Sequence, residues 1–291
     1  MLASPMIATK HPGIFPVFGL LFIGLTALSA PQAQAQDNKA APARDTQARD
    51  TQAQKRDWDI TIGGGGVLQP DYEGSDEYKV SPLPYVNIKY KDLVFLRGPM
   101  LGVNLFTMQG PRPGDKLQIG PLIRYQMGRE ADDNDALRGL GDIDAGFELG
   151  GFITYGVGPW SVGVTAFQDI SDTHDGLTVK LNGGYNHAFG PKLRGRVEVY
   201  TTWASDDYMQ TFFGVSAAQS PLSGMRQYTP EAGFKDVGLS INMDYAFNQH
   251  WGLTGMLGYK QLLGDAADSP LVEDRGSASQ LMSGLFLRYR F

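Results

Sequence analysis

The chain has 291 residues, a formal net charge of −6, no cysteine, 37 glycines and 11% aromatic residues. The lack of cysteine excludes disulfides and cysteine-based metal sites, and the acidic balance argues against a nucleic-acid partner. The mean hydropathy of −0.23 argues against a helical membrane protein but fits a membrane barrel, because only half of each barrel strand faces lipid.

The N-terminal part of the chain has the pattern of an export signal followed by a linker. Residues 1–35 contain a short apolar run at 14–28 and an A-x-A cleavage site at 33–35, which predicts a signal peptide. The run is too short for a membrane anchor and is broken by Pro16. Residues 36–56 are mainly Gln, Ala, Asp and Arg, which predicts a disordered periplasmic linker. A partner-binding tail is the alternative for this segment.

Residues 57–291 are predicted to form one outer-membrane β-barrel. Apolar and polar residues alternate along them with period two, which is the period of a strand. Membrane strands need about 9–11 residues, which suits the segments found here. Eleven clear strands are predicted at 58–66, 80–90, 93–106, 117–126, 143–155, 160–166, 177–186, 193–203, 237–248, 251–263 and 279–291. The third is interrupted at Gly98-Pro99.

The number of strands must be even if both ends of the barrel domain lie in the periplasm. Adding a short candidate at Met209–Val215 gives twelve strands, whereas dropping it with one N-terminal strand gives ten. The predicted fold is therefore all-β, a transmembrane antiparallel up-and-down β-barrel of about twelve strands, with ten as the alternative. The short connection at 189–192 and the long one at 129–141 fall on unexpected sides of this twelve-stranded arrangement.

The last predicted strand, 279–291, indicates how the barrel closes. Its odd positions are mostly apolar and its even positions include Arg288 and Arg290, so one face suits lipid and the other suits water. An edge strand of a soluble sandwich is the alternative. In a barrel this strand must pair with the first one, near Trp58–Leu68, because closure leaves no free edge. The predicted signal for the barrel assembly machinery consists of Leu287, Tyr289 and Phe291.

The polar faces of the predicted strands carry charges of both signs. The charged residues predicted to face the lumen are Arg124, Asp144, Glu148, Lys180, Arg194, Arg196, Glu198, Asp244, Lys260, Arg288 and Arg290. Mixed signs favour ion pairs across a narrow hydrated interior and define neither a clear anion selector nor a clear cation selector. A small-solute channel is the alternative.

No catalytic, cofactor or metal site is predicted. Outside the signal peptide, His174, His187 and His250 lack metal-ligand spacing. There is no G-x-S-x-G nucleophile elbow. The acidic segment Asp132–Asp135 lacks the alternating oxygen ligands and central glycine of a calcium loop, so a solvated loop is expected, with weak surface calcium binding as the alternative.

Several long motifs resemble the MltA-interacting protein (MipA/OmpV) family of outer-membrane proteins. They are the segments at 57–78 (DWDITIGGGGVLQPDYEGSDEY), 82–92 (PLPYVNIKYKD), 206–220 (DDYMQTFFGVSAAQS), 233–239 (GFKDVGL), 262–272 (LLGDAADSPLV) and 287–291. The resemblance implies a non-enzymatic barrel. It also implies a scaffold that joins a lytic transglycosylase to a murein synthase, with a surface adhesin as the alternative. It offers no catalytic or partner-binding residues to carry over.

Overall fold

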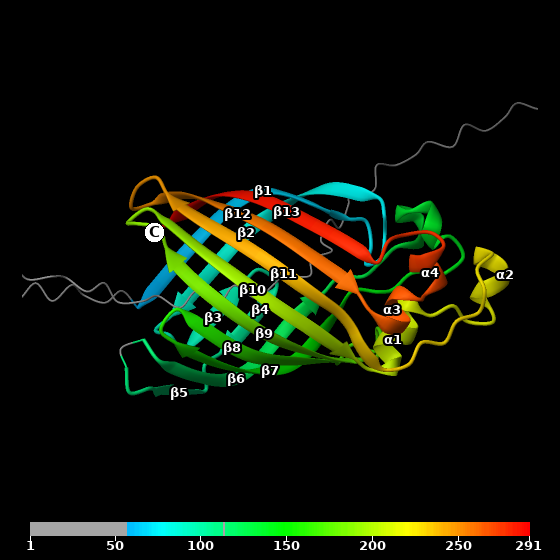
Figure 1. The fold of residues 1–291 in the computed structure, drawn as a ribbon, viewed down its shortest axis with the longest axis horizontal. Coiled ribbons are helices and arrows are strands. Elements are labelled where there is room, and N and C mark those ends of the chain that lie inside the picture. The colour runs from blue at the N-terminus through cyan, green and yellow to red at the C-terminus, as the bar shows by residue number, and fades with distance from the viewer. Residues whose placement is uncertain (1–56, 113) are drawn as a thin grey trace, which may run out of the picture.

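The alternating segments pair into a closed β-barrel with short helices over one end (Figure 1). The computed structural model describes residues 57–112 and 114–291. The predicted signal peptide at 1–35 and linker at 36–56 lie outside the described residues. The strands are β1 (Trp58–Pro70), β2 (Tyr78–Tyr90), β3 (Val94–Arg97), β4 (Met100–Val103), β5 (Phe106–Gln109), β6 (Lys116–Gln126), β7 (Gly146–Val157), β8 (Trp160–Asp169), β9 (Leu177–Ala188), β10 (Leu193–Ala204), β11 (Gly233–Ala246), β12 (Trp251–Leu262) and β13 (Ser279–Arg290).

Twelve of these strands form the barrel wall, and all their pairings are antiparallel. Each strand pairs with the next in sequence except at β4, which pairs with β6, and β13, which returns to β1. The strand β5 pairs with β6 beside β4 and is an extra strand outside the closed circuit. The predicted all-β, antiparallel barrel of about twelve strands is confirmed.

Side-chain burial follows the period-two pattern that the sequence predicts. In β13, the ring of Phe286 is 2% exposed, whereas Leu285 and Leu287 on either side of it are 55% and 48% exposed. The barrel therefore buries one face of each strand inside and presents the other face, rich in aliphatic residues, to the outside.

The last strand pairs with the first, as predicted, from Thr61 opposite Arg290 to Leu68 opposite Ser283. The glycine run in β1 makes this approach possible. A Cβ atom on Gly63 would lie 2.1 Å from the carbonyl oxygen of Leu287, and one on Gly65 would lie 2.0 Å from that of Leu285. No side chain fits at such a distance, so these glycines let the two closing strands meet.

The twelfth strand predicted at Met209–Val215 is wrong, because this segment forms the helix α1 (Asp206–Phe213) and the residues that follow it. Tyr208, Met209, Phe212 and Phe213 are the buried residues of this helix. Their spacing of three and four residues places them on one helical face. Two acidic residues open the helix, which suits the positive end of its dipole.

The count of twelve is restored elsewhere, in the segment predicted as one strand at 93–106. Gly98 has φ of +52° and precedes Pro99, so the chain reverses there and forms the hairpin β3–β4. Splitting one strand into two changes the side of the barrel on which every later connection falls. The connection at 189–192 then joins the other short turns, and the one at 129–141 joins the other long loops.

We call the two ends of the barrel the turn end and the capped end. The turn end carries the connections of a few residues at 91–93, 158–159, 189–192 and 247–250. The capped end carries the long loops at 71–77, 127–145, 170–176, 205–232 and 263–278. These loops hold α1, α2 (Gln219–Ser223), α3 (Gly264–Ala267), α4 (Pro270–Glu273) and two 3-10 turns, η1 (Ala131–Asp133) and η2 (Asp135–Leu137). None of the described helices is long and apolar enough to cross a membrane.

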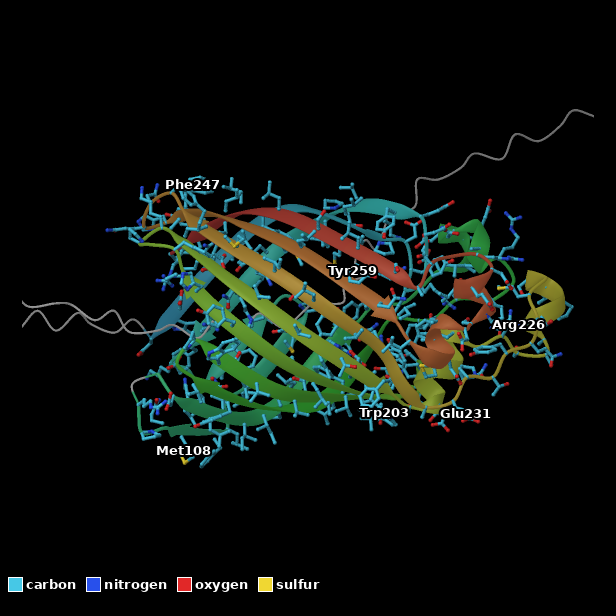
Figure 2. All side chains as sticks on the ribbon, in the orientation of Figure 1. Met108, Trp203, Arg226, Glu231, Phe247 and Tyr259 are labelled. Carbon is cyan, nitrogen blue, oxygen red and sulfur yellow. The ribbon has the colours of Figure 1, made fainter. Side chains whose placement is uncertain are left out.

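Aromatic side chains form a band near the turn end. Trp58 lies 4.7 Å from Tyr90 and Trp160 lies 4.6 Å from Tyr185, measured between ring centroids. Figure 2 shows Phe247 at this end and Arg226 at the opposite, capped end. Aromatic bands of this kind mark the membrane interface in barrels.

Leu239 and Tyr245 provide a matched test of the lipid-facing surface. They lie on the same face of β11, at its middle and near its turn end, and are 39% and 40% exposed. We expect Leu239→Arg to lower the free energy of unfolding by about 2–4 kcal/mol and Tyr245→Arg by about 0–1 kcal/mol, because an arginine costs most at the bilayer midplane. Urea unfolding in lipid vesicles measures both. Equal losses would contradict this placement.

Removing the last five residues tests the closing contact. These residues pair with β1 on one side, up to Leu287 opposite Gly64, and with β12 on the other. Their deletion would leave unpaired backbone groups in hydrocarbon, each costing several kcal/mol. We expect the truncated chain to lose the compact, heat-modifiable gel mobility of a folded barrel. A folded band would show that closure does not need this part of β13.

Candidate functional site

The inner face of the barrel is the candidate site, because charged side chains converge there. The basic residues on the inner face of the strands are Lys79, Lys89, Arg97, Lys116, Arg124, Lys180, Arg194, Arg196, Lys235, Lys260, Arg288 and Arg290. The acidic ones are Asp59, Glu148, Asp169, Glu198, Asp236 and Asp244. Most of the predicted lumen-facing charges therefore lie within one interior, where their individual partners differ.

The deepest charges form a network below the cap. Glu73, in the loop at 71–77, accepts hydrogen bonds from Lys235 at 2.6 Å and Lys260 at 2.5 Å. Lys235 also donates to Asp236 at 2.7 Å. Two cations and two anions thus offset one another in a place that excludes water, as buried charges require.

A bulge in β11 makes this network possible. The pairing of β10 with β11 shifts between Thr202 and Trp203, so that Lys235 has no opposite residue. Lys235 and Asp236 are consecutive, yet both are buried, which regular strand alternation does not allow.

The charge of Glu73 depends on its two lysines. Burial alone would raise the pKa of its carboxyl group, but the positive charges of Lys235 and Lys260 hold that pKa well below its usual range. Glu73 is therefore ionised at neutral pH and ties the loop at 71–77 to β11 and β12.

A second cluster joins β6, β7 and the loop at 170–176. Arg124 donates to Glu148 at 2.5 Å and its guanidinium lies 4.1 Å from the ring centroid of Phe167. His174 Nε2 lies 3.6 Å from Glu148 Oε1, and both side chains are almost fully buried. The ring of His174 also meets those of Tyr208 and Phe212 in α1, edge to face.

A third cluster lies at mid-barrel on β9 and β10. Glu198 accepts a hydrogen bond from Arg196 at 2.7 Å and one from Lys180 at 3.1 Å. Arg196 also donates to Ser161 at 3.3 Å and to Asn186 at 3.3 Å. One anion here faces two cations, so the local charge is positive.

Four further predicted residues lie toward the turn end. Arg288 pairs with Asp244 at 3.2 Å, and Arg290 forms a two-pronged contact with Asp59 at the exposed turn end. Arg194 is exposed at the same end.

Asp144 departs from the predicted pattern. It lies before β7 begins and is exposed, whereas the neighbouring Ile143 is buried in the cap. The reason is that Ile143 forms an isolated bridge with Arg129 in a loop, outside the regular strand.

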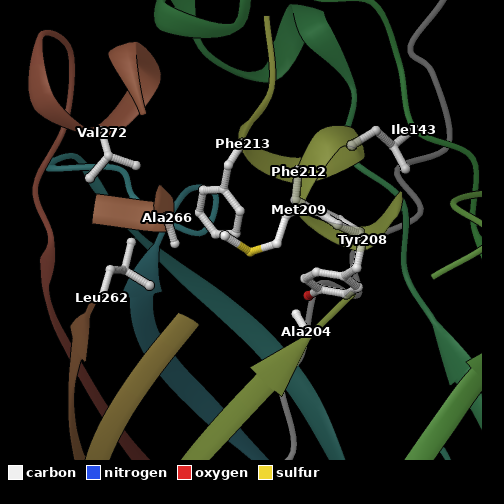
Figure 3. Close-up of a cluster of buried hydrophobic side chains, with 9 residues drawn as sticks. All are labelled: Ile143, Ala204, Tyr208, Met209, Phe212, Phe213, Leu262, Ala266 and Val272. Carbon is white, nitrogen blue, oxygen red and sulfur yellow. The ribbon is translucent and has the colours of Figure 1, made fainter. Parts of the chain in front are cut away.

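The capped end is closed by a cluster of apolar side chains (Figure 3). The buried cluster comprises Ile143, Ala204, Tyr208, Met209, Phe212, Phe213, Leu262, Ala266 and Val272. It brings together α1, α3, α4 and the ends of β10 and β12. Close packing of this kind leaves few gaps as large as a water molecule, so the helices act as a plug over the barrel.

The histidines and the acidic segment considered in the sequence analysis lie in separate parts of the described structure. No group of three His, Cys, Asp or Glu side chains among the described residues could hold a metal ion. The acidic segment at 132–135 forms η1 and the start of η2, and Asn134 within it donates to Asp71 and Glu77, each at 3.0 Å. His187 packs against Phe189 and His250 stacks on Tyr289 at the turn end.

Sequence reasoning missed several residues of this interior, namely Glu73, Arg97, His174, Lys235 and Asp236. Arg97 and Asp236 had a usable signal, since Arg97 lies two residues after the inward-facing Phe95 on β3 and Asp236 lies four residues before the inward-facing Ser240 on β11. The others come from loops or from the bulge, where the period-two pattern does not apply.

The closed circuit, the apolar outer face and the aromatic band together define an outer-membrane β-barrel protein. The chain belongs to the MltA-interacting protein MipA family, whose family model matches residues 62–291. It is a member of a murein-related family and resides in the outer membrane. By the usual orientation of such barrels, the turn end faces the periplasm and the capped end faces outward.

Curated relatives agree with this assignment. The MltA-interacting protein of Escherichia coli is 26% identical over 79% of this chain and 90% of its own length. Outer membrane protein OmpV of Vibrio cholerae is 24% identical over 61% of this chain and 67% of its own. Among solved structures, an outer membrane channel of Pseudomonas putida is 12% identical to this chain. The match covers 89% of this chain and 100% of the channel, with a TM-score of 0.41.

Glu73→Gln tests the network under the cap. It leaves Lys260 without its buried partner, and breaking a buried ion pair from one side costs about 3–5 kcal/mol of unfolding free energy. Glu273→Gln is the matched control, because its pair with Arg226 at 2.8 Å is exposed. It should cost about 0–1 kcal/mol. Urea unfolding in vesicles compares the two, and equal effects would show that the network does not stabilise the barrel.

The same network makes stability depend on pH. The folded-state pKa of Glu73 is lowered, so its contribution is complete above the unfolded pKa of about 4.3 and is lost as pH falls toward the folded pKa. We expect the free energy of unfolding to fall more between about pH 6 and about pH 3 in the wild-type protein than in Glu73→Gln. Parallel curves for the two proteins would contradict the assignment.

Proposed function

We propose that this barrel is a non-enzymatic scaffold in murein maintenance, which holds a murein hydrolase and a murein synthase at its periplasmic end. The family and the name of the Escherichia coli relative support a lytic transglycosylase as the hydrolase partner. The synthase partner rests on the resemblance of the sequence to this family. In this proposal the inner charges listed above face the lumen and hold the barrel rigid.

The observation that carries this proposal is the extra strand β5 at the turn end. It pairs with β6 alone, so its second edge has no partner strand among the described residues. An unpaired edge in hydrocarbon would cost several kcal/mol for each unsatisfied group, so such an edge belongs at the periplasmic rim or under a partner. An exposed edge is a common docking place for an extended segment of another protein.

The side chains around β5 also suit a partner. Leu105, Phe106 and Met108 are 77%, 51% and 51% exposed, and Figure 2 shows Met108 at the outer side of the turn end. Aromatic and methionine side chains are enriched in the centres of protein interfaces. The free edge of β5 therefore offers backbone hydrogen bonds to a partner, and the exposed side chains around it offer apolar contact.

Two alternatives compete with a scaffold. A small-solute channel requires a path through the barrel, and the packed cluster over the capped end argues against one. An adhesin would use the capped end, where the tip helix α2 exposes Leu222. The assembly of the barrel is proposed to use Leu287 and Tyr289, which share the outer face of β13 beside outer-membrane lipid, together with Phe291, which directly follows the strand.

A photo-cross-linking amino acid at Met108 tests the scaffold in intact cells. We expect it to capture a lytic transglycosylase, because β5 lies at the end that faces the murein. The same amino acid at Leu222, on the opposite end, is the matched control and should capture no murein enzyme. Phe106→Asp should reduce capture at Met108 while the barrel keeps its heat-modifiable mobility. Capture of the transglycosylase from Leu222 alone, or from neither position, would reject the scaffold.

A further inference from the structure

Within the described strands, twelve basic and six acidic side chains share the inner face of the barrel. The excess of basic side chains is not spread evenly along the barrel. Below the cap, Lys235 and Lys260 are offset by Glu73 and Asp236, and Arg124 is offset by Glu148. The uncompensated positive charge therefore lies from mid-barrel toward the periplasmic end.

Arg97 on β3 is the clearest uncompensated charge. Its guanidinium lies 4.4 Å from the ring centroid of Phe95, and it forms no ion pair with any of the described residues. Its Nε atom is buried and has no hydrogen-bond partner. Arg97 is only partly exposed, so its guanidinium has lost part of its hydration without gaining an anion in return, which is unfavourable.

Arg97 and Arg196 both occupy inward-facing strand positions. They belong to β3 and β10, which are separated by six strand steps in either direction around the twelve-stranded circuit. The two side chains thus point into the barrel from opposite walls, and Glu198 offsets only part of the charge on the second wall.

We propose that a small oxyanion, a carboxylate or a phosphate, binds inside the barrel between Arg97 and Arg196. Guanidinium groups match both anions with paired N–H···O bonds, and an anion placed there supplies the counter-charge that Arg97 lacks. The plug closes the outward end, so the anion enters from the periplasm past the basic inner wall. This site does not depend on the proposed scaffold.

Phosphate titration of the purified barrel tests this site. The urea midpoint is measured in uncharged detergent at constant ionic strength, with sodium chloride replaced stepwise by inorganic phosphate or by glutarate. We expect the midpoint to rise and saturate with the anion that the site prefers, because a ligand of the folded state stabilises it. Phosphorus NMR line broadening of phosphate reports the binding directly. A midpoint that responds to neither anion overturns the site.

Arg97→Gln is the decisive variant. It removes an uncompensated charge, so it should be at least as stable as the wild type without phosphate, and its affinity should fall about tenfold or more. Arg226→Gln, an exposed arginine at the capped end, is the matched control and should respond as the wild type does. Equal responses from both variants, or failure of Arg97→Gln to assemble, would overturn the proposal, since Arg97 would then have a different role.

Discussion

Closure of the barrel is the constraint on which the rest of the structure depends. A strand in hydrocarbon has no water to satisfy its backbone, so every edge must be paired. The contact between β1 and β13 completes the circuit, and it requires glycines where the carbonyl groups of β13 come nearest. The glycine run in β1 and the alternating last strand are therefore both needed for closure, although they lie at opposite ends of the domain in the sequence.

Closure also determines what the interior contains. Closure encloses the charged inner faces of twelve strands, and a buried charge needs a partner. The ion pairs around Glu73, Glu148 and Glu198 meet this need, and the apolar cluster of α1 and α3 covers them at the outward end. In the proposed scaffold, the periplasmic rim and β5 are the part of the barrel that contacts other molecules.

The sequence was sufficient for most of the wall and insufficient where the period-two pattern stops. In regular strands such as β11 and β13 the two faces can be assigned from the sequence, because every second side chain contacts lipid. The hairpin at Gly98-Pro99 was predicted as one interrupted strand. The helix α1 was predicted as a strand, since a short apolar run suits either structure. Lys235 was beyond prediction, because a bulge depends on the partner strand and leaves no period of its own.

The interior charge illustrates the same limit on a larger scale. The net charge of −6 describes the whole chain, but the fold separates the two signs. The five long loops of the capped end hold nineteen acidic and four basic residues, whereas basic residues outnumber acidic ones two to one on the inner face of the strands. An overall acidic composition therefore conceals a basic interior, and only the placement of each residue on a loop or an inner face shows that this barrel is suited to hold an anion.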